Sequence, residues 1–562
     1  MRRYKLVQTV PIILLMVQAT VISGMMKHNK FRITTTKEII ITSAEGDKLK
    51  NQTNVEFVEG KGLGNVITIH PEIRKQAMDG IGTSFTESSA FVLAHLDRKL
   101  REDVMKNVFG ETGADFTLTR THIGACDFSV EGRYSYAPVK DDKDLQSFSI
   151  EEDNKGFDKS RYPGVIDNNY DLLPMIKEAI SIKQKQKDKD LRIIASAWTA
   201  PDWMKDIEDW YIPGGPENNW QGTGGTLKTW YEETYAKYII KYLQSYREEG
   251  IDIWGLTPVN EPHGNNGQWE SMHFSPETQN VFVKKYLGPQ LQANGFNKLK
   301  LLVYDQNRDG LEHWTDYIFS DKETSSFVYG VAVHWYESTF KVYDNVFERV
   351  HAKHPDFSII HTEGCIDDLG KDAPNGVLDP VKFKESDWFN NDDFWWDDNA
   401  TDWAYSVTWQ GVNSEDHPAY APVHRYARNI IVSIDHWVKG WIDWNIVLDK
   451  NGGPNHVGNF CGAPIMIDSD KQFVYYTPIF HILSQFSRTI RPGDIAVQTE
   501  KTIPELDNDT IHTCATINND GLLSVQILNT SNGAIDYNLQ IGEQYCPVTI
   551  KANALQTVRI QL

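Results

Sequence analysis

The chain has 562 residues, of which 40% are hydrophobic and 24% are charged, and its formal net charge is −21. A chain of this length and composition can bury more than one core and is typical of a folded globular protein. The negative charge excludes nucleic acid and anionic membranes as electrostatic partners.

The first residues are typical of an export signal. Arg2, Arg3 and Lys5 precede a mostly apolar stretch, residues 6–22, which small residues follow. This pattern predicts a signal peptide over residues 1–24 and an exported protein, whether secreted, periplasmic or lysosomal. We expect the mature protein to be soluble, because no second long apolar run follows in the sequence.

The two ends of the mature chain are rich in Thr, Val, Ile and turn residues and show little helical periodicity. Residues 28–75 and 489–562 therefore predict the strands of a β-sandwich domain that is assembled from both terminal segments. The five cysteines are too few for a disulfide framework. Cys514 and Cys546 lie in the same segment, so a disulfide between these two is left open.

The region between these ends, residues 76–488, alternates between strands and helices. Strands are expected at 79–84, within 114–129, and at 191–198, 251–259, 301–304, 328–335, 358–362 and 438–444. Helices are expected at 91–109, 172–187 and 227–249, where apolar residues recur at helical spacing. Eight strands that alternate with helices predict an α/β fold, the (β/α)8 or TIM barrel.

Two of the predicted barrel strands end on a glutamate. Glu261 follows one strand within Asn260-Glu261-Pro262, and Glu363 ends another just before Gly364. The carboxyl ends of barrel strands meet at the face that carries active sites, so we expect the two carboxyls to face each other. Glycoside hydrolysis needs such a pair, one to protonate the leaving oxygen and one to attack the anomeric carbon or activate water.

Eight short motifs along the chain are similar, in sequence and in order, to those of a known enzyme family. They are DGIGTSFTESSA, RTHIGACDFS, ASAWTAPDWMK, GLTPVNEP, VAVHWY, IIHTEGC, GWIDWN and GGPNHVGNF, and they run nearly from end to end of the chain. The chain resembles glycoside hydrolase family 30, and within it the glucosylceramidases. The resemblance implies a retaining hydrolase in which Glu261 is the acid/base and Glu363 the nucleophile. It also implies that the terminal segments fold as a β-sandwich against the barrel.

The same resemblance implies roles for further residues. Those that match residues binding the hydroxyls of a terminal glucose are Asp127, Trp198, Asn260 and Trp444. His334 and Tyr336 match a pair near the nucleophile, and Tyr336 is expected to donate to Glu363 and lower its pKa. Arg120 matches a cation that holds nearby carboxylates in place.

No cofactor and no metal are expected. A metal site formed by His334, His361 and Cys365 would be possible on residue type, but these residues lack a compact ligand spacing. The sequence does not predict an oligomeric state.

The chain departs from the animal glucosylceramidases where the aglycone should approach. The departures are residues 263–277, residues 392–403, and His456, which stands where a Trp is common. Recognition of glucose is therefore better supported than recognition of ceramide. The predicted function is a retaining β-glucosidase that acts on a glycolipid, glucosylceramide, with transient contact to a membrane or micelle surface.

Two alternatives remain. An endo-β-1,6-glucanase acting on β-glucan, or another β-glycosidase of the family, would use the same fold and the same carboxyl pair. A carbohydrate-binding barrel without turnover is the alternative of another class, and the presence of both Glu261 and Glu363 argues against it.

Overall fold

The described part of the chain begins after the predicted export signal. The structure is a computed structural model, and it describes residues 32–338, 340–366, 371–372, 377–378, 388–397, 420–504 and 506–562. The predicted signal peptide, residues 1–24, lies outside these ranges, as do residues 398–403 of the acidic aromatic stretch.

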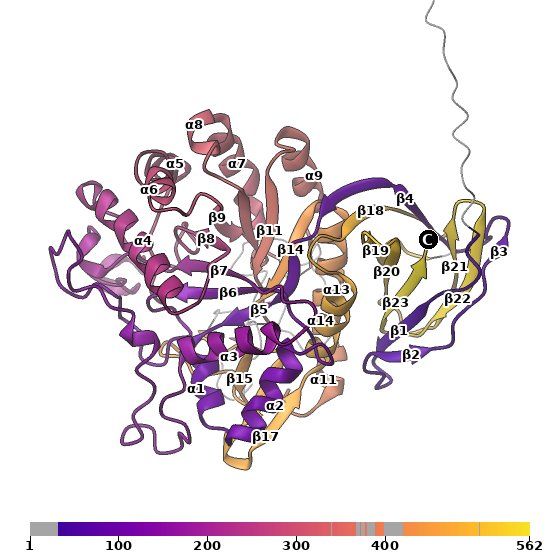
Figure 1. The fold of residues 1–562 in the computed structure, drawn as a ribbon, viewed down its shortest axis with the longest axis horizontal. Coiled ribbons are helices and arrows are strands. Elements are labelled where there is room, and N and C mark those ends of the chain that lie inside the picture. The colour runs from indigo at the N-terminus through magenta and orange to yellow at the C-terminus, as the bar shows by residue number, and fades with distance from the viewer. Residues whose placement is uncertain are drawn as a thin grey trace, which may run out of the picture. The chain divides into compact units, whose positions relative to one another are not determined.

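Eight parallel strands close into a barrel (Figure 1). In chain order they are β5 (Gly80–Phe85), β6 (Leu118–Ile123), β7 (Arg192–Ala197), β8 (Gly255–Thr257), β9 (Lys300–Asn307), β10 (Gly330–His334), β11 (Ser358–Glu363) and β14 (Val438–Asp443). Each strand pairs with its neighbour in sequence, and β14 closes the barrel against β5. The predicted (β/α)8 barrel is confirmed, although β8 is shorter than the expected strand over residues 251–259.

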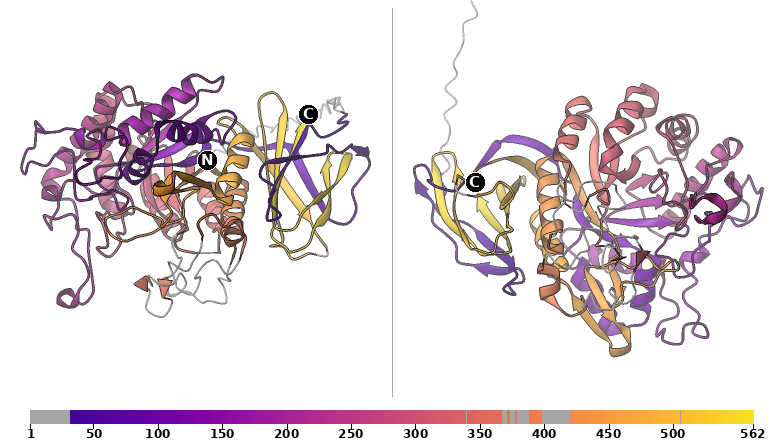
Figure 2. Two further views of the ribbon diagram at one scale, coloured as in Figure 1. Left: turned by 90° about the horizontal axis from the view of Figure 1, so that it is seen from below. Right: turned by 180° about the vertical axis from the view of Figure 1, so that it is seen from behind.

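Helices connect the barrel strands and surround them (Figures 1 and 2). They are α1 (Glu87–Ala94), α2 (Arg98–Phe109), α3 (Leu172–Gln184), α4 (Glu232–Glu248), α5 (Pro276–Phe282), α6 (Gly288–Ala293), α7 (Leu311–Ser320), α8 (Lys322–Ser325), α9 (Asp344–Lys353), α11 (Asp392–Trp396), α13 (Pro422–Asp435) and α14 (Pro478–Thr489). The single helix expected over residues 91–109 is two helices, because the Asp97 carboxylate accepts from the Leu100 N–H and starts α2. None of the helices in the described ranges combines the length and apolar character needed to span a bilayer.

Shorter elements fill the connections. A three-stranded sheet consists of β15 (Val447–Asp449), β16 (Ile465–Asp468) and β17 (Phe473–Tyr476), and β12 (Lys371–Asp372) pairs with β13 (Val377–Leu378). The short helical turns are η1 (Glu151–Asp153), η2 (Asp202–Met204), η3 (Pro216–Asn218), η4 (Thr229–Tyr231), η5 (Val283–Leu287), η6 (Arg308–Gly310) and η8 (Ser469–Lys471).

The interior of the barrel is layered, and the layering positions the site. One cluster of buried apolar side chains consists of Leu118, Ile194, Leu302, Ala332, Ile360 and Ile442. Alternate residues of a strand point to the same face, so the inward residues two positions later form the next layer. On four strands that layer is polar and fully buried: Arg120, Ser196, His334 and Thr362. An apolar floor thus carries a polar layer at the carboxyl ends of the strands.

Strands from both ends of the chain form the second body, which confirms the predicted β-sandwich. Its ten strands follow the order β2 (Lys50–Gln52), β1 (Glu38–Ser43), β23 (Ala554–Gln561), β20 (Leu522–Asn529), β19 (Ile511–Ile517), β18 (Ile495–Thr502), β4 (Val66–Ala77), β21 (Ile535–Ile541), β22 (Gln544–Ile550) and β3 (Val58–Glu59). Figure 2 shows the strands from the two ends interleaved. Gln485 of α14 ties this body to the barrel, because it accepts from Thr42 at 2.7 Å and donates to Thr557 at 2.9 Å.

Cys514 and Cys546 form no disulfide. Both thiols are buried, but Cys546 packs in the core of the sandwich whereas Cys514 packs in the core that includes the barrel helices. The two side chains therefore lie in different cores, which their common segment in the sequence does not reveal.

Three carboxyls near α1 and α3 are buried and hold protons at mildly acidic pH. Burial, reinforced by the Asp171 charge, raises the pKa of Glu87 to about 8. Burial raises the pKa of Asp153 to about 7, although the Tyr136 and Tyr246 hydroxyls donate to it. Burial likewise raises the pKa of Asp171 to about 6.

We expect the folded state to lose stability as the pH rises. In the unfolded chain these carboxyls titrate near pH 4, so their contribution is full below about pH 4 and is lost as the pH rises through the folded values. Glu87→Gln should reduce the fall in Tm between pH 5 and pH 8 by on the order of 1–3 °C. Glu208→Gln is the control, because Lys140 and Lys228 lower the pKa of this exposed carboxyl to about 2. An equal fall in Tm for wild type and Glu87→Gln would contradict the expectation.

Candidate active site

Glu261 and Glu363 face each other at the carboxyl ends of their strands. One oxygen of each carboxyl and one nitrogen of His334 all lie within 4.8 Å of one another. Glu363 is the last residue of β11, whereas Glu261 follows β8 with a φ of 49°, a left-handed conformation that a residue with a side chain rarely adopts. Its N–H donates to the Asp305 carbonyl at 2.9 Å and its carbonyl accepts from Gly264 at 2.8 Å. These bonds hold a strained residue in place, as is common at functional sites.

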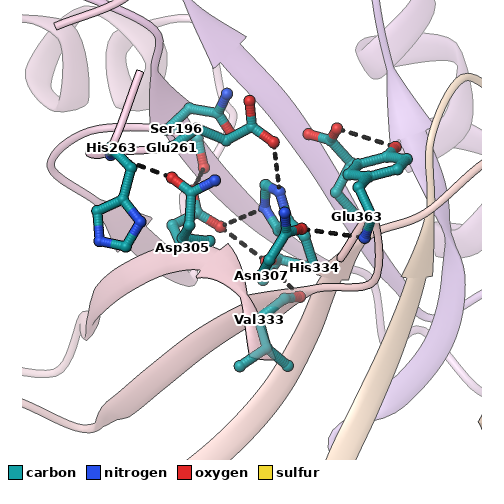
Figure 3. A network of polar contacts seen from close by, with 12 residues as sticks. Ser196, Glu261, His263, Asp305, Asn307, Val333, His334 and Glu363 are labelled. Carbon is teal, nitrogen blue, oxygen red and sulfur yellow. Dashed lines mark hydrogen bonds and ion pairs between the residues drawn. The ribbon is translucent and has the colours of Figure 1, made fainter. Parts of the chain in front are cut away.

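Asp305 joins the side chains of the polar layer to one another, and no sequence motif marks this residue. Its carboxylate accepts from Arg120 at 2.8 Å and from Thr257 and Thr362 at 2.7 Å. It also accepts from His334 at 3.0 Å (Figure 3). These partners lie on β6, β8, β11 and β10, so one carboxylate joins four strands of the barrel besides its own.

A bulge in β9 turns Asp305 inward. Ala332 of β10 pairs with Tyr304, but Val333 pairs with Gln306, so Asp305 is an extra residue in the ladder. Tyr304 and Asp305 have φ values of 75° and 68°. Strict alternation along β9 from Leu302 would point Tyr304 inward instead. The only hint in the sequence is an Asp at the end of an otherwise apolar strand.

His334 lies between two carboxylates and is charged. Its Nδ1 is 3.1 Å from Glu261 Oε1 and its Nε2 is 3.0 Å from Asp305 Oδ1, so both nitrogens donate (Figure 3). Burial opposes the charge, but Glu363 and Asp305 raise the pKa of His334 to about 10. Although burial also opposes ionisation of Asp305, Arg120 and His334 hold the pKa of that carboxyl far below its usual range.

Both oxygens of Glu363 are engaged. Arg120 Nη1 contacts Oε2, and the Tyr336 hydroxyl donates to Oε1 at 3.1 Å. The expected hydrogen bond from Tyr336 is present, but the net pKa of Glu363 is raised rather than lowered. Burial raises the pKa of Glu363, and the opposing charges of His334 and Arg120 do not cancel that effect. Arg120 also donates to Asn260 Oδ1 at 2.7 Å and thereby positions the residue before Glu261.

The remaining predicted residues form the wall beside the two carboxyls. The rings of Trp198 and Trp444 stack with centroids 5.2 Å apart, and the Arg120 guanidinium lies over Trp198 at 4.8 Å. Burial, reinforced by the charges of Glu363 and Glu261, raises the pKa of Asp127 to about 8. The structure thus brings all nine predicted residues together.

Polar atoms in this wall remain available. Asn459 Nδ2 donates to Asp127 Oδ2 at 3.0 Å. Across the ranges that the structure describes, Asp127 Oδ1 and the indole N–H groups of Trp198 and Trp444 make no hydrogen bond to protein. A carboxylate oxygen and two indole donors in a largely buried wall suit a ligand that is rich in hydroxyl groups. Asn459 lies in the motif GGPNHVGNF, but the sequence does not predict its role.

Among the described residues, Glu261, His334 and Glu363 are also the one group whose donor atoms could surround a metal ion. Both nitrogens of His334 already donate hydrogen bonds, and Arg120 contacts Glu363. Two positive groups would therefore repel a metal cation at this position, which favours acid/base chemistry over metal binding.

Comparisons with known proteins match both the barrel and the sandwich. The family model for the glycosyl hydrolase family 30 TIM-barrel domain matches residues 78–414 and 399–490, and that for the family 30 beta sandwich domain matches residues 495–558. Putative glucosylceramidase 4 of Caenorhabditis elegans is 27% identical over 538 residues, which are 94% of this chain and 89% of the relative. Lysosomal acid glucosylceramidase of Mus musculus is 27% identical over 474 residues, which are 84% of this chain and 78% of the relative.

A solved endo-β1,6-glucanase shares the fold, with a TM-score of 0.70, 23% identity, and coverage of 94% of this chain and 99% of the other. The family matches extend over both the barrel and the sandwich and over more than half of the chain. The chain therefore belongs to glycoside hydrolase family 30, a family of enzymes.

Proposed function

We propose that the chain is a retaining β-glucosidase that hydrolyses glucosylceramide to glucose and ceramide. The separation of the two carboxyls carries the proposal, because an oxygen of Glu261 lies within 4.8 Å of an oxygen of Glu363. Retaining glycosidases hold their carboxyl groups about 5–5.5 Å apart, whereas inverting enzymes leave about 6.5–9.5 Å for a water molecule. The short separation supports direct attack by one carboxylate on the sugar.

In this mechanism Glu363 is the nucleophile and Glu261 the acid/base. Glu363 attacks the anomeric carbon, and the bond to the leaving oxygen breaks as Glu261 gives that oxygen its proton. Glu261 then takes a proton from water, which displaces Glu363 and releases glucose with its original configuration. His334 binds only Oε1 of Glu261, so Oε2 is left for the glycosidic oxygen. Arg120 and Tyr336 fix the orientation of Glu363.

The wall beside the carboxyls would hold the terminal glucose. Asp127 and Asn260 offer oxygen and amide groups to sugar hydroxyls, and Trp198 and Trp444 offer indole N–H groups beside apolar ring faces. All four side chains are at most 4% exposed, so a hydroxyl bound there is shielded from water. Such burial makes each sugar contact selective, because a missing partner leaves a buried polar group unsatisfied.

Glucosylceramide is proposed because the two relatives named glucosylceramidases align over most of this chain. The lysosomal location in the name of one relative, together with the pattern of residues 1–24, supports export as part of the proposal. An endo-β-1,6-glucanase remains the alternative, since the solved glucanase shares the fold. Fold and carboxyl pair are common to both activities.

Release of glucose from two substrates tests the aglycone. We expect turnover of glucosylceramide in mixed detergent micelles and little turnover of a β-1,6-glucan oligomer. Hydrolysis of the lipid should depend strongly on detergent, because ceramide must be presented at a surface, while a soluble aryl glucoside should respond less. Glu363→Ala is the control for contaminating activity. Efficient cleavage of the glucan beside negligible action on the lipid would replace the proposal by its alternative.

Variants of the two carboxyls should behave differently with a dinitrophenyl glucoside. This leaving group needs no acid, so Glu261→Ala should show a burst of dinitrophenol followed by a stalled second step. Azide needs no general base, so it should restore turnover and give a β-glucosyl azide. Glu363→Ala lacks the nucleophile, so it should show no burst and, with azide, give the α-azide. Exchanged products would exchange the two roles, and an inverted sugar from the wild type would exclude the retaining mechanism.

Replacement of Asp127 should lower kcat/KM without unfolding the protein. Asp127→Ala removes an acceptor of sugar hydroxyls, and we expect kcat/KM for an aryl glucoside to fall on the order of 10³-fold. The control is Asp144→Ala, an exposed carboxyl in the same long connection between β6 and α3. A fall of less than about threefold in a folded variant would remove Asp127 from the glucose site.

A further inference from the structure

His456 lies near Asp127, and its ring is held from two sides. Nδ1 is 2.9 Å from the carbonyl oxygen of Ser129, and Nε2 is 3.0 Å from Oε2 of Glu270. Carbonyl and carboxylate oxygens only accept hydrogen bonds, so both ring nitrogens donate and the ring is an imidazolium. Burial opposes this charge, but the hydrogen bond and the charge of Glu270 raise the pKa of His456.

The buried carboxylate of Glu270 is stabilised by this cation. Its side chain is 0% exposed, and besides His456 it accepts from the Arg133 N–H at 2.6 Å. A carboxylate at this depth is costly unless it is paired and hydrogen-bonded. Gly132 makes room for the ring, because its φ is +66° and a Cβ there would lie 2.3 Å from His456 Nε2. The loops after β6, β8 and β14 therefore meet at a single ion pair.

A closed turn connects His456 to the glucose wall. Asn455 Oδ1 accepts from the N–H groups of Val457 and Asn459 at 3.1 Å and 2.9 Å, and these bonds close residues 455–459 into one turn. Asn459 Nδ2 donates to Asp127 Oδ2 at 3.0 Å. His456 and Asn459 thus fasten one loop to the Asp127 loop at two points, Ser129 and Asp127.

We propose that His456 is a positioning residue for glucose binding: its ion pair with Glu270 holds the 455–459 turn so that Asn459 keeps Asp127 oriented toward the sugar. The inference rests on the proposed function, because it matters only if Asp127 binds glucose. Binding of the sugar should therefore weaken when His456 loses its proton.

Other groups around the ion pair of His456 and Glu270 also titrate or carry charge. Those that act on His456 or Glu270 are Asp127, Arg133, Lys205 and Cys126. Burial lowers the pKa of Lys205 to about 7, and Asp127 titrates with a pKa of about 8. A residue that does not titrate in place of His456 therefore separates the contribution of His456 to the pH dependence of binding from that of the other groups.

The first experiment follows the ring protons of His456 by NMR as a function of pH, without any sugar. Glu270→Gln should lower the pKa of His456 by about one unit or more, because a neighbouring opposite charge typically shifts a pKa by about 1–3 units. His436 is a matched control, since its Nδ1 pairs with Glu348 at 2.8 Å. Its ring resonances at a given pH should be the same in wild type and Glu270→Gln. An unchanged pKa of His456 in that variant would contradict the proposed ion pair between His456 and Glu270.

The second experiment measures the Kd of phenyl 1-thio-β-glucoside, a neutral glucoside that resists hydrolysis, by calorimetry at about pH 6 and about pH 8.5. We expect His456→Ala to raise Kd about tenfold at the lower pH, with kcat for an aryl glucoside changed less than about threefold. His456→Gln keeps a donor but cannot titrate, so it should bind better than His456→Ala and lose part of the pH dependence. His436→Ala should match the wild type.

The outcomes separate the two proposals. If wild-type protein does not bind the thioglucoside, the proposed function and this inference both fall. If wild type binds but His456→Ala binds within about twofold of it, the inference alone falls. A lowered Tm with unchanged Kd and unchanged pH dependence would give His456 a purely structural role and would also overturn the inference. Should His456→Ala not fold, the same comparison is made with His456→Gln and Glu270→Gln.

Discussion

The buried guanidinium of Arg120 fixes the side chains at the carboxyl ends of the barrel strands. Arg120 is fully buried, and its donors bind Glu363, Asp305, Asn260 and Ser196, which come from four different parts of the barrel rim. Removal of one partner from a buried ion pair typically costs about 3–5 kcal/mol, because the remaining charge is left without compensation. The strand ends are therefore held in one arrangement, and the dipoles around the two facing carboxyls are fixed before any ligand binds.

The sequence predicts those features that depend on local pattern. Strand ends mark Glu261 and Glu363, whereas Arg120 and His334 are predicted only through the resemblance of their motifs to the family. Asp305 escapes prediction because a bulge with positive φ breaks the alternation. The pKa of Glu363 escapes prediction because burial depends on the packing of all eight strands around it, not on its neighbours in sequence.

The site divides its tasks between rigid and variable parts of the fold. Carboxyls that would perform chemistry lie on or next to barrel strands, whereas the residues that hold Asp127 come from loops. Loops tolerate substitution more readily than strands do. A His–Glu pair at the loop junction is therefore compatible with an unchanged polar layer below it, and selectivity for the sugar or the aglycone can change while the carboxyl pair stays the same.

The pairing of β1 with β23 has a consequence for synthesis on the ribosome. β1 and β4 emerge early, but their partners β23, β18 and β21 belong to the last part of the chain. Until β18, β21 and β23 have been synthesised, the N-terminal strands have unpaired edges, which are prone to aggregate, while the whole barrel is made between them and their partners. β23 thus completes the sheet that β1 began, so a chain that stops before β23 leaves β1 without this partner.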